Sequence, residues 1–239
     1  MTDHKSISDR KILAIIPARG GSQRVPRKNL AELNGKPLIA WTIADARRAK
    51  FINRIIVSTD DDEIAAVSRG LDAEVVDRPA DISGHMANSE SALIHVLEHL
   101  HNTEVYIPDL VVFLQATSPL RDETDIDSAI KTLLTEDADS LFSAGPIPGF
   151  AWTLRDGLAT PVNYDPRNRP RTQDLMETIV AENGSIYVFK PEVLLRTRCR
   201  LGGKIAVHEQ QPINCYEIDY PSDIEWIEKL MAIAPDVPQ

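Results

Sequence analysis

Short apolar runs rich in valine, isoleucine and leucine alternate along this chain with longer amphipathic stretches. This alternation is typical of β-α units around a mostly parallel sheet. The apolar runs predict strands at residues 11–17, 54–58, 74–76, 110–114, 140–144, 186–189 and 205–209. The amphipathic stretches predict helices at residues 37–49, 60–70, 89–101, 123–135 and 222–230. We therefore expect an α/β fold.

Composition excludes several classes of protein. The 239 residues include 26 Lys plus Arg against 36 Asp plus Glu, and 43% of them are hydrophobic, enough for a sizeable core. The formal charge of −10 argues against general duplex nucleic-acid binding, which needs a basic face. The polar first ten residues and the two cysteines, Cys199 and Cys215, which match no zinc or paired-thiol spacing, predict a cytoplasmic protein with no membrane partner.

Between Gly145 and Met176 the regular pattern is interrupted. Prolines and arginines replace clean periodicity there, with prolines at 146, 148, 161, 166 and 170 and arginines at 155, 167, 169 and 171. We interpret this stretch as an insertion into the α/β framework.

The densest chemical signal is the loop at residues 18–29, directly after the first predicted strand. It holds two adjacent glycines and four cations in an otherwise acidic chain. Open α/β sheets bind ligands at the carboxyl ends of their strands, and glycine, arginine and lysine suit a phosphate. The loop matches neither the P-loop nor the dinucleotide fingerprint, so another kind of phosphate loop is expected. The alternative is a solvated basic loop.

Polar residues at two further places indicate a site. Gln115 ends the buried run at 110–114, where the alternative is a strand end capped by side-chain hydrogen bonds. Glu217 and Asp219 lie two apart on a predicted strand, so both would point the same way and could share a divalent ion. Asp223 follows them, either near that ion or as a first-turn helix acid. Ser222 and Glu225 have the spacing of a capping box that would open the last helix.

Six segments, in order and over nearly the whole chain, carry a resemblance to a known family. They are IPARGGSQRVPRKN (16–29), NGKPLIAWTI (34–43), IIVSTDDDEIA (55–65), QATSPLR (115–121), ENGSIYVF (182–189) and EIDYPSD (217–223). Together they resemble the acylneuraminate cytidylyltransferases, which activate sialic acids and related nonulosonic acids. The resemblance implies a single domain over residues 1–239 with a three-layer, Rossmann-like nucleotidyltransferase fold. It also implies that an insertion at about 145–180 forms a homodimer.

The resemblance further implies transfer of CMP from CTP to the anomeric hydroxyl of a 2-keto-3-deoxy sugar acid, with release of pyrophosphate. Arg19, Lys28 and Asp219 would be catalytic, and Glu217 and Asp219 would hold Mg²⁺. The implied nucleotide-binding residues are Ala18, Arg19, Gly20, Gly21, Ser22, Lys28, Asn29, Arg78 and Ser89. The implied residues on the sugar side are Gln115, Thr117, Ser118, Arg171, Asn183, Gly184 and Ser185, with Arg171 supplied by the partner subunit. A role at an exposed dimer rim is the alternative for Arg171.

The chain departs from the family pattern at two places. Glu217 stands where many members have aspartate, and residues 83–89 read SGHMANS where members commonly have a serine-aspartate-threonine-alanine stretch. The second departure bears on contacts to the base and weakens any assignment to N-acetylneuraminate itself. Two alternatives remain: synthesis of CMP-Kdo or CMP-amino-Kdo, and a catalytically inactive sensor of sugar nucleotides.

Overall fold

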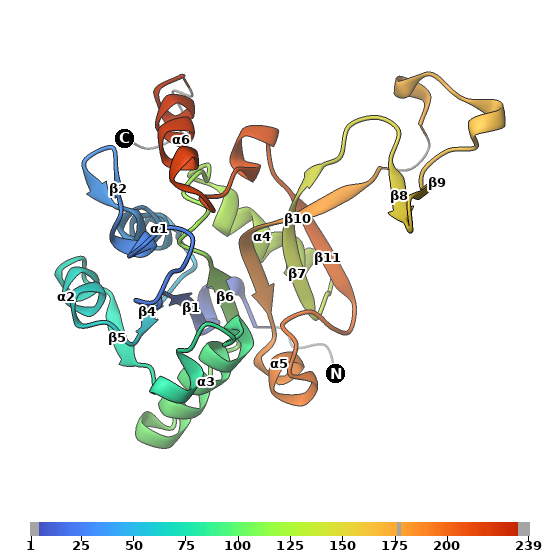
Figure 1. Ribbon diagram of the computed structural model, residues 1–239. Coiled ribbons are helices and arrows are strands. Elements are labelled where there is room, and N and C mark those ends of the chain that lie inside the picture. Colours follow the sequence, from blue (N-terminus) through green and yellow to red (C-terminus); the bar gives the residue numbers. More distant parts are fainter. Residues whose placement is uncertain (1–4, 176–177, 234–239) are drawn as a thin grey trace.

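The chain folds around a seven-stranded sheet in the computed structural model, which describes residues 5–175 and 178–233. The strand order is β11-β7-β10-β6-β1-β4-β5 (Figure 1). The strands are β1 (Ile12–Pro17), β4 (Arg54–Thr59), β5 (Glu74–Asp77), β6 (Leu110–Leu114), β7 (Ser140–Pro146), β10 (Val180–Phe189) and β11 (Ile205–Glu209). All the pairs in this sheet are parallel except those of β10, which runs antiparallel to both β6 and β7. The predicted mostly parallel sheet is confirmed.

Helices cover both faces of this sheet because successive side chains of a strand point to opposite sides. The helices are α1 (Leu38–Arg48), α2 (Asp62–Gly70), α3 (Ser89–Glu104), α4 (Asp125–Thr135), α5 (Pro191–Thr197) and α6 (Pro221–Ile233). Ile12 and Ile16 of β1 join a core with α1, α2 and α4, whereas Leu13 and Ile15 join a second core with α3 and α5. The predicted three-layer fold is confirmed, and Figure 1 shows α3 and α5 below the sheet.

A third apolar cluster attaches the end of the described chain to the rest. Ile227, Leu230 and Met231 of α6 pack against Leu38 and Trp41 of α1. This packing places the segment before α6 beside the loop that follows β1, which matters for the site below.

Short elements complete the described structure. Two small hairpins form outside the main sheet, β2 (Glu32–Leu33) with β3 (Lys36–Pro37) and β8 (Trp152–Arg155) with β9 (Leu158–Pro161). The 3-10 helices are η1 (Ile7–Asp9), η2 (Lys28–Leu30), η3 (Ala80–Ile82), η4 (Pro166–Asn168), η5 (Thr172–Asp174) and η6 (Pro212–Cys215). The β8–β9 hairpin extends away from the sheet and helices (Figure 1). It lies in the expected insertion, of which residues 176 and 177 are outside the described residues.

Two expectations near the end of the chain are wrong. Residues 216–219 form no strand, because the backbone there makes a single hydrogen bond to the neighbouring segment, from the N–H of Ile218 to the carbonyl of Thr117. The helix begins at Pro221, so Ser222 lies inside it and cannot open a capping box with Glu225. Instead the carboxylate of Asp223 accepts hydrogen bonds from the N–H groups of Asp219 and Tyr220, at 2.8 and 2.7 Å. The interpretation of Asp223 as a first-turn helix acid is confirmed.

Within the described residues, none of the helices combines the length and the hydropathy that a membrane span requires.

Candidate active site

A pocket opens at the carboxyl ends of β1 and β6. These strands are parallel neighbours, and the chain leaves β1 toward β4 on one side and later returns to β6 on the other. Such a reversal of strand order is where open α/β sheets bind ligands. The cavity measures about 310 Å³. It is lined by Pro17, Arg19, Ser22, Gln23, Arg24, Lys28, Asn29, Arg78, Ala87, Asn88, Ser89, Phe113, Gln115, Ala116, Thr117, Glu217 and Asp219.

Two of the cations at this pocket converge on one carboxylate. Lys28 Nζ donates to the carbonyl of Ile218 at 2.7 Å and to Asp219 Oδ1 at 3.1 Å. Arg24 Nη1 lies 3.2 Å from Asp219 Oδ2, on the other oxygen of that carboxylate. Arg24 and Arg27 belong to the same cationic loop at residues 18–29, but the structure separates the two. Arg27 forms ion pairs with Asp61 and Glu63 outside the pocket.

Arg78 is a buried cation on the pocket wall. Its Nε donates to Ser58 Oγ at 3.1 Å and its Nη2 to the Ser58 carbonyl at 2.5 Å, which fixes the guanidinium against β4. The pKa of Arg78 is lowered to about 10, chiefly by burial, while the charge of Asp60 raises it and that of Arg19 lowers it. Arg78 therefore stays charged at neutral pH although it has lost most of its hydration. A pocket with such a cation on its wall favours an anionic ligand.

The loop after β1 is held against the start of α2. The N–H of Gly20 donates to Asp60 at 3.0 Å, and a β-carbon at Gly20 would lie 2.6 Å from Asp61 Oδ2. Asp61 caps α2 by accepting from the N–H groups of Glu63 and Ile64. Gly20 thus permits close packing on α2. It is absent from the pocket lining, as are Ala18 and Gly21, which were expected beside the nucleotide.

Two carboxylates face the same pocket. Burial raises the pKa of Glu217, and the negative charge of Asp219 raises it further, against lowering by Lys28 and Arg121. Across residues 5–175 and 178–233, no three His, Cys, Asp or Glu side chains gather as a metal site. Two carboxylates completed by phosphate oxygens and water are nevertheless the ligand set that Mg²⁺ commonly takes. The donors present therefore fit a magnesium ion that arrives with a phosphorylated ligand.

Gln115 and Glu217 line the pocket, and Gly184, which is absent from the lining, packs closely against both. Gly184, on the antiparallel strand β10, has a φ of +69°. A β-carbon there would lie 1.9 Å from Glu217 Oε1 and 2.9 Å from Gln115 Nε2. Only glycine combines this backbone conformation with such close contact.

Replacing Gly184 with alanine is expected to destabilise the fold by about 1–3 kcal/mol and to reduce turnover as well, because the methyl group must displace Glu217. Gly35→Ala is the matched control, since Gly35 has a φ of +76° and open space around its α-carbon. Thermal unfolding and steady-state kinetics check the prediction. Equal effects of the two substitutions on both measurements would contradict the close packing at Gly184.

The remaining residues expected on the sugar side lie outside the pocket lining. Ser118 and Ser185 are fully buried. Asn183 is tied inward, accepting from Ser143 Oγ at 2.6 Å and donating to Gln210 at 2.7 Å. Its side chain supports the irregular part of β10 beside Gly184, and Asn183 is absent from the pocket lining.

Arg171 also lies outside the pocket of its own chain. It is exposed in the insertion and pairs with Asp174 at 2.6 Å.

The segment that departs from the family pattern forms part of the pocket. Asn88 caps α3 by accepting from the N–H of Ser91 at 3.0 Å, and Ala87, Asn88 and Ser89 line the cavity. Arg19 Nη1 donates to the carbonyl of Gly84 at 2.7 Å, which joins this segment to the loop after β1. Among the lining residues that sequence reasoning missed, Asn88 had a usable signal, namely its position directly before a predicted helix.

The fold and this cationic pocket define a class: α/β proteins that bind a phosphorylated ligand where the strand order of the sheet reverses. The sequence pattern of the cytidylyltransferases matches residues 13–236, and the chain belongs to this cytidylyltransferase family.

Individual relatives agree with the family. The N-acylneuraminate cytidylyltransferase A of Danio rerio is 35% identical over 230 residues, covering 94% of this chain and 51% of the relative. The chain thus spans about half the length of that protein. The post-translational flagellin modification protein B of Campylobacter coli is 30% identical over 233 residues, covering 92% of this chain and 95% of the relative.

A solved structure shares the fold. A CMP:2-keto-3-deoxy-manno-octonic acid synthetase complexed with CTP superposes with a TM-score of 0.67, covering 93% of this chain and 98% of that one, at 19% identity. This likeness supports the three-layer nucleotidyltransferase fold.

Proposed function

We propose that the protein transfers CMP from CTP to the anomeric hydroxyl of a nonulosonic acid, a sialic acid or a relative of one, and releases pyrophosphate. The observation that carries this proposal is the gathering of four cations and two carboxylates in one pocket at the ends of β1 and β6. The match of residues 13–236 to the cytidylyltransferase family and the name of the Danio rerio relative support CTP as the nucleotide and an acylneuraminate-like acid as the acceptor.

The chain's own residues suit the charge changes of such a reaction. Attack on the α-phosphorus of CTP places negative charge on the phosphoryl oxygens and on departing pyrophosphate, so fixed cations lower the barrier. Arg19, Arg24, Lys28 and Arg78 supply that charge within one cavity. Gln115, which lines the same pocket beside Glu217, would donate a hydrogen bond to the sugar acid.

We propose Mg²⁺ as the cofactor, held by Asp219 and Glu217 together with phosphate oxygens. When bound, the ion would neutralise phosphate charge and favour ionisation of the attacking hydroxyl. Asp219 already sits between Lys28 and Arg24, so it also orients these two cations.

A panel of acceptors tests the function. Pyrophosphate release is measured with CTP and Mg²⁺ for sialic, legionaminic and pseudaminic acids, Kdo and 8-amino-Kdo. Turnover of a nine-carbon acid supports the proposal, whereas turnover of Kdo alone makes the protein a CMP-Kdo synthetase. CTP binding without turnover of any acid would favour the sensor alternative.

We further propose a cytoplasmic homodimer formed through the β8–β9 hairpin. A two-stranded hairpin alone is marginally stable in water. Leu154 and Leu158 are 76% and 75% exposed, and Trp152 is 46% exposed. This exposed apolar surface needs a cover, and a second copy of the same hairpin is the partner we propose.

Introducing charge on the hairpin is expected to break the dimer. The double substitution Leu154→Asp/Leu158→Asp should shift the mass measured by light scattering from two chains to one, because burying two carboxylates in an apolar interface is costly. Val105→Asp is the control, since Val105 is 78% exposed at the end of α3. A double variant that keeps the mass of two chains would refute this interface.

A further inference from the structure

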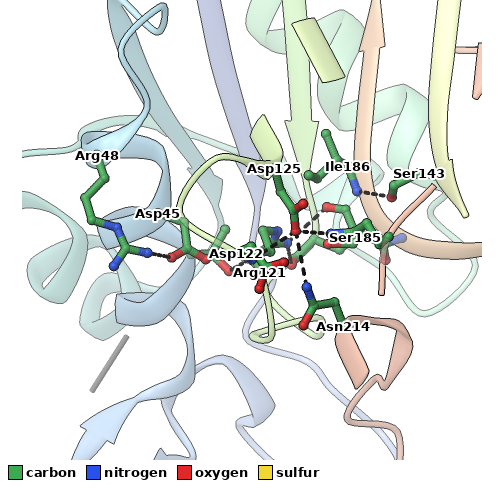
Figure 2. Close-up of polar contacts among 12 residues, drawn as sticks. Asp45, Arg48, Arg121, Asp122, Asp125, Ser143, Ser185, Ile186 and Asn214 are labelled. Carbon is green, nitrogen blue, oxygen red and sulfur yellow. Dashed lines mark hydrogen bonds and ion pairs between the residues drawn. The ribbon is translucent and has the colours of Figure 1, made fainter. Parts of the chain in front are cut away.

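Arg121 is the largest fully buried side chain in the described part of the molecule, although it carries a charge. Its guanidinium donates to the carbonyl oxygens of Gln115 (2.7 Å) and Ser185 (3.0 Å), Thr42 Oγ1 (3.1 Å) and Asp45 Oδ2 (3.3 Å). Figure 2 shows Arg121 between Asp45 on one side and Ser185 on the other. Arg121 does not line the pocket itself, so it acts on a ligand through these partners and through its charge, which lowers the pKa of Glu217.

One of the four acceptors, the carbonyl of Gln115, belongs to a residue that lines the pocket, and a second, the carbonyl of Ser185, lies directly behind it. Gln115 is the first residue after β6, and its side chain faces the cavity. Ser185 follows Gly184, the residue in tight contact with Gln115 and Glu217. These two backbone segments come from strands that are neighbours in the sheet, with Ile186 of β10 opposite the last residue of β6. The planar guanidinium of Arg121 therefore fixes the distance between the two backbone segments that contain Gln115 and Gly184.

Stability alone gives little reason for a charged pair at this position. Burial raises the pKa of Asp45 to about 6, even though Arg121 and Arg48 lower it, and burial likewise lowers the pKa of Arg121. Arg121 Nε has no hydrogen-bond partner among the described residues. An apolar pair of similar volume is often as stable as a buried ion pair or more so. An apolar pair would, however, lack the hydrogen bonds to the carbonyls of Gln115 and Ser185.

We propose that Arg121 is a positioning residue for the sugar-acid half of the active site, acting through the backbone at Gln115 and Gly184. This inference rests on the proposed function. The cations expected to meet the triphosphate, including Arg19, Lys28 and Arg78, have no hydrogen bond to Arg121. Loss of the hydrogen bonds from Arg121 to these two backbone segments should therefore weaken binding of the acceptor acid and leave CTP binding nearly unchanged.

Two variants separate positioning from folding. The double substitution Arg121→Met/Asp45→Leu removes both buried charges together, so the Asp45 carboxylate is not left buried without Arg121. Arg121→Lys keeps a charge for Asp45, but one ammonium cannot reproduce the fork of the guanidinium. Arg48→Met is the matched control, because Arg48 also pairs with Asp45, at 2.5 Å, and does not contact the pocket wall.

The experiment measures kcat and KM separately for the acceptor acid and for CTP, with the melting temperature of each variant. We expect the acid KM to rise about tenfold or more in both Arg121 variants, while the CTP KM stays within about twofold and Arg48→Met changes neither. Unchanged kinetics in a folded variant would overturn the inference, and so would an equal loss for both substrates, which indicates a merely structural role. Absence of wild-type turnover with every acid would instead overturn the proposed function.

Discussion

Replacing Asp219 with asparagine is expected to lower kcat/KM by about 10³-fold or more, since one charge would bind Mg²⁺, as proposed above, and also orients two cations of the pocket. The structure gives the second part of this reason directly, because Lys28 and Arg24 each approach a different oxygen of the Asp219 carboxylate. Loss of the charge should free Arg24 to turn away and leave Lys28 held by the carbonyl of Ile218 alone. Turnover and its magnesium dependence are the measurements.

Asp77→Asn is the control for this substitution. Asp77 lies at the exposed end of β5, where its carboxylate is 3.8 Å from Arg69 and outside the pocket. It should keep wild-type kinetics. Near-normal, magnesium-dependent turnover of Asp219→Asn would remove Asp219 from the site.

Lys28→Met is expected to reduce kcat/KM by about 10²–10³-fold, because a fixed cation is lost where charge develops on the phosphates. Lys28 is well placed for such an effect. Its side chain is only 11% exposed and is anchored by the carbonyl of Ile218, so it needs little reorganisation during the reaction.

Lys229→Met is the control for this substitution. It makes the same lysine-to-methionine change at an exposed position of α6 outside the pocket, and it should keep normal kinetics. Arg78 and Arg19 remain in the Lys28→Met variant, so CTP binding should weaken less than turnover. An unchanged kcat/KM for Lys28→Met would contradict the role assigned to Lys28.

The framework of the fold could be read from the sequence because its signals are local. Buried parallel strands give continuous apolar runs, and the predicted run at 110–114 has the same bounds as β6. The strand bearing Gly184 is longer than predicted, since β10 begins at Val180 and not at residue 186. Residues 181 and 182 are exposed, and Asn183 and Ser185 are polar, so apolar runs alone could not reveal this part of the strand.

The site could be predicted only in part, for a physical reason. Residue types and spacing marked the loop at 18–29 as cationic, but not which cation faces the pocket. Arg27 has a φ of 52° and turns toward Asp61, whereas Arg24 faces Asp219. That choice depends on the packing of α2 and α6 around the loop, which no local pattern encodes. Arg121 was hidden for the same reason, because its partners come from three segments of the chain, α1, the end of β6 and β10.

In the proposed reaction the nucleotidyl group of CTP, and not its terminal phosphate, is transferred to the acceptor acid. CTP labelled with ³²P at the α position and CTP labelled at the γ position are incubated in parallel with Mg²⁺ and the best acceptor acid. We expect the α label to appear in a CMP-sugar and the γ label only in pyrophosphate. Transfer of the γ label to the acid, or release of inorganic phosphate with the α label left in CDP, would contradict it.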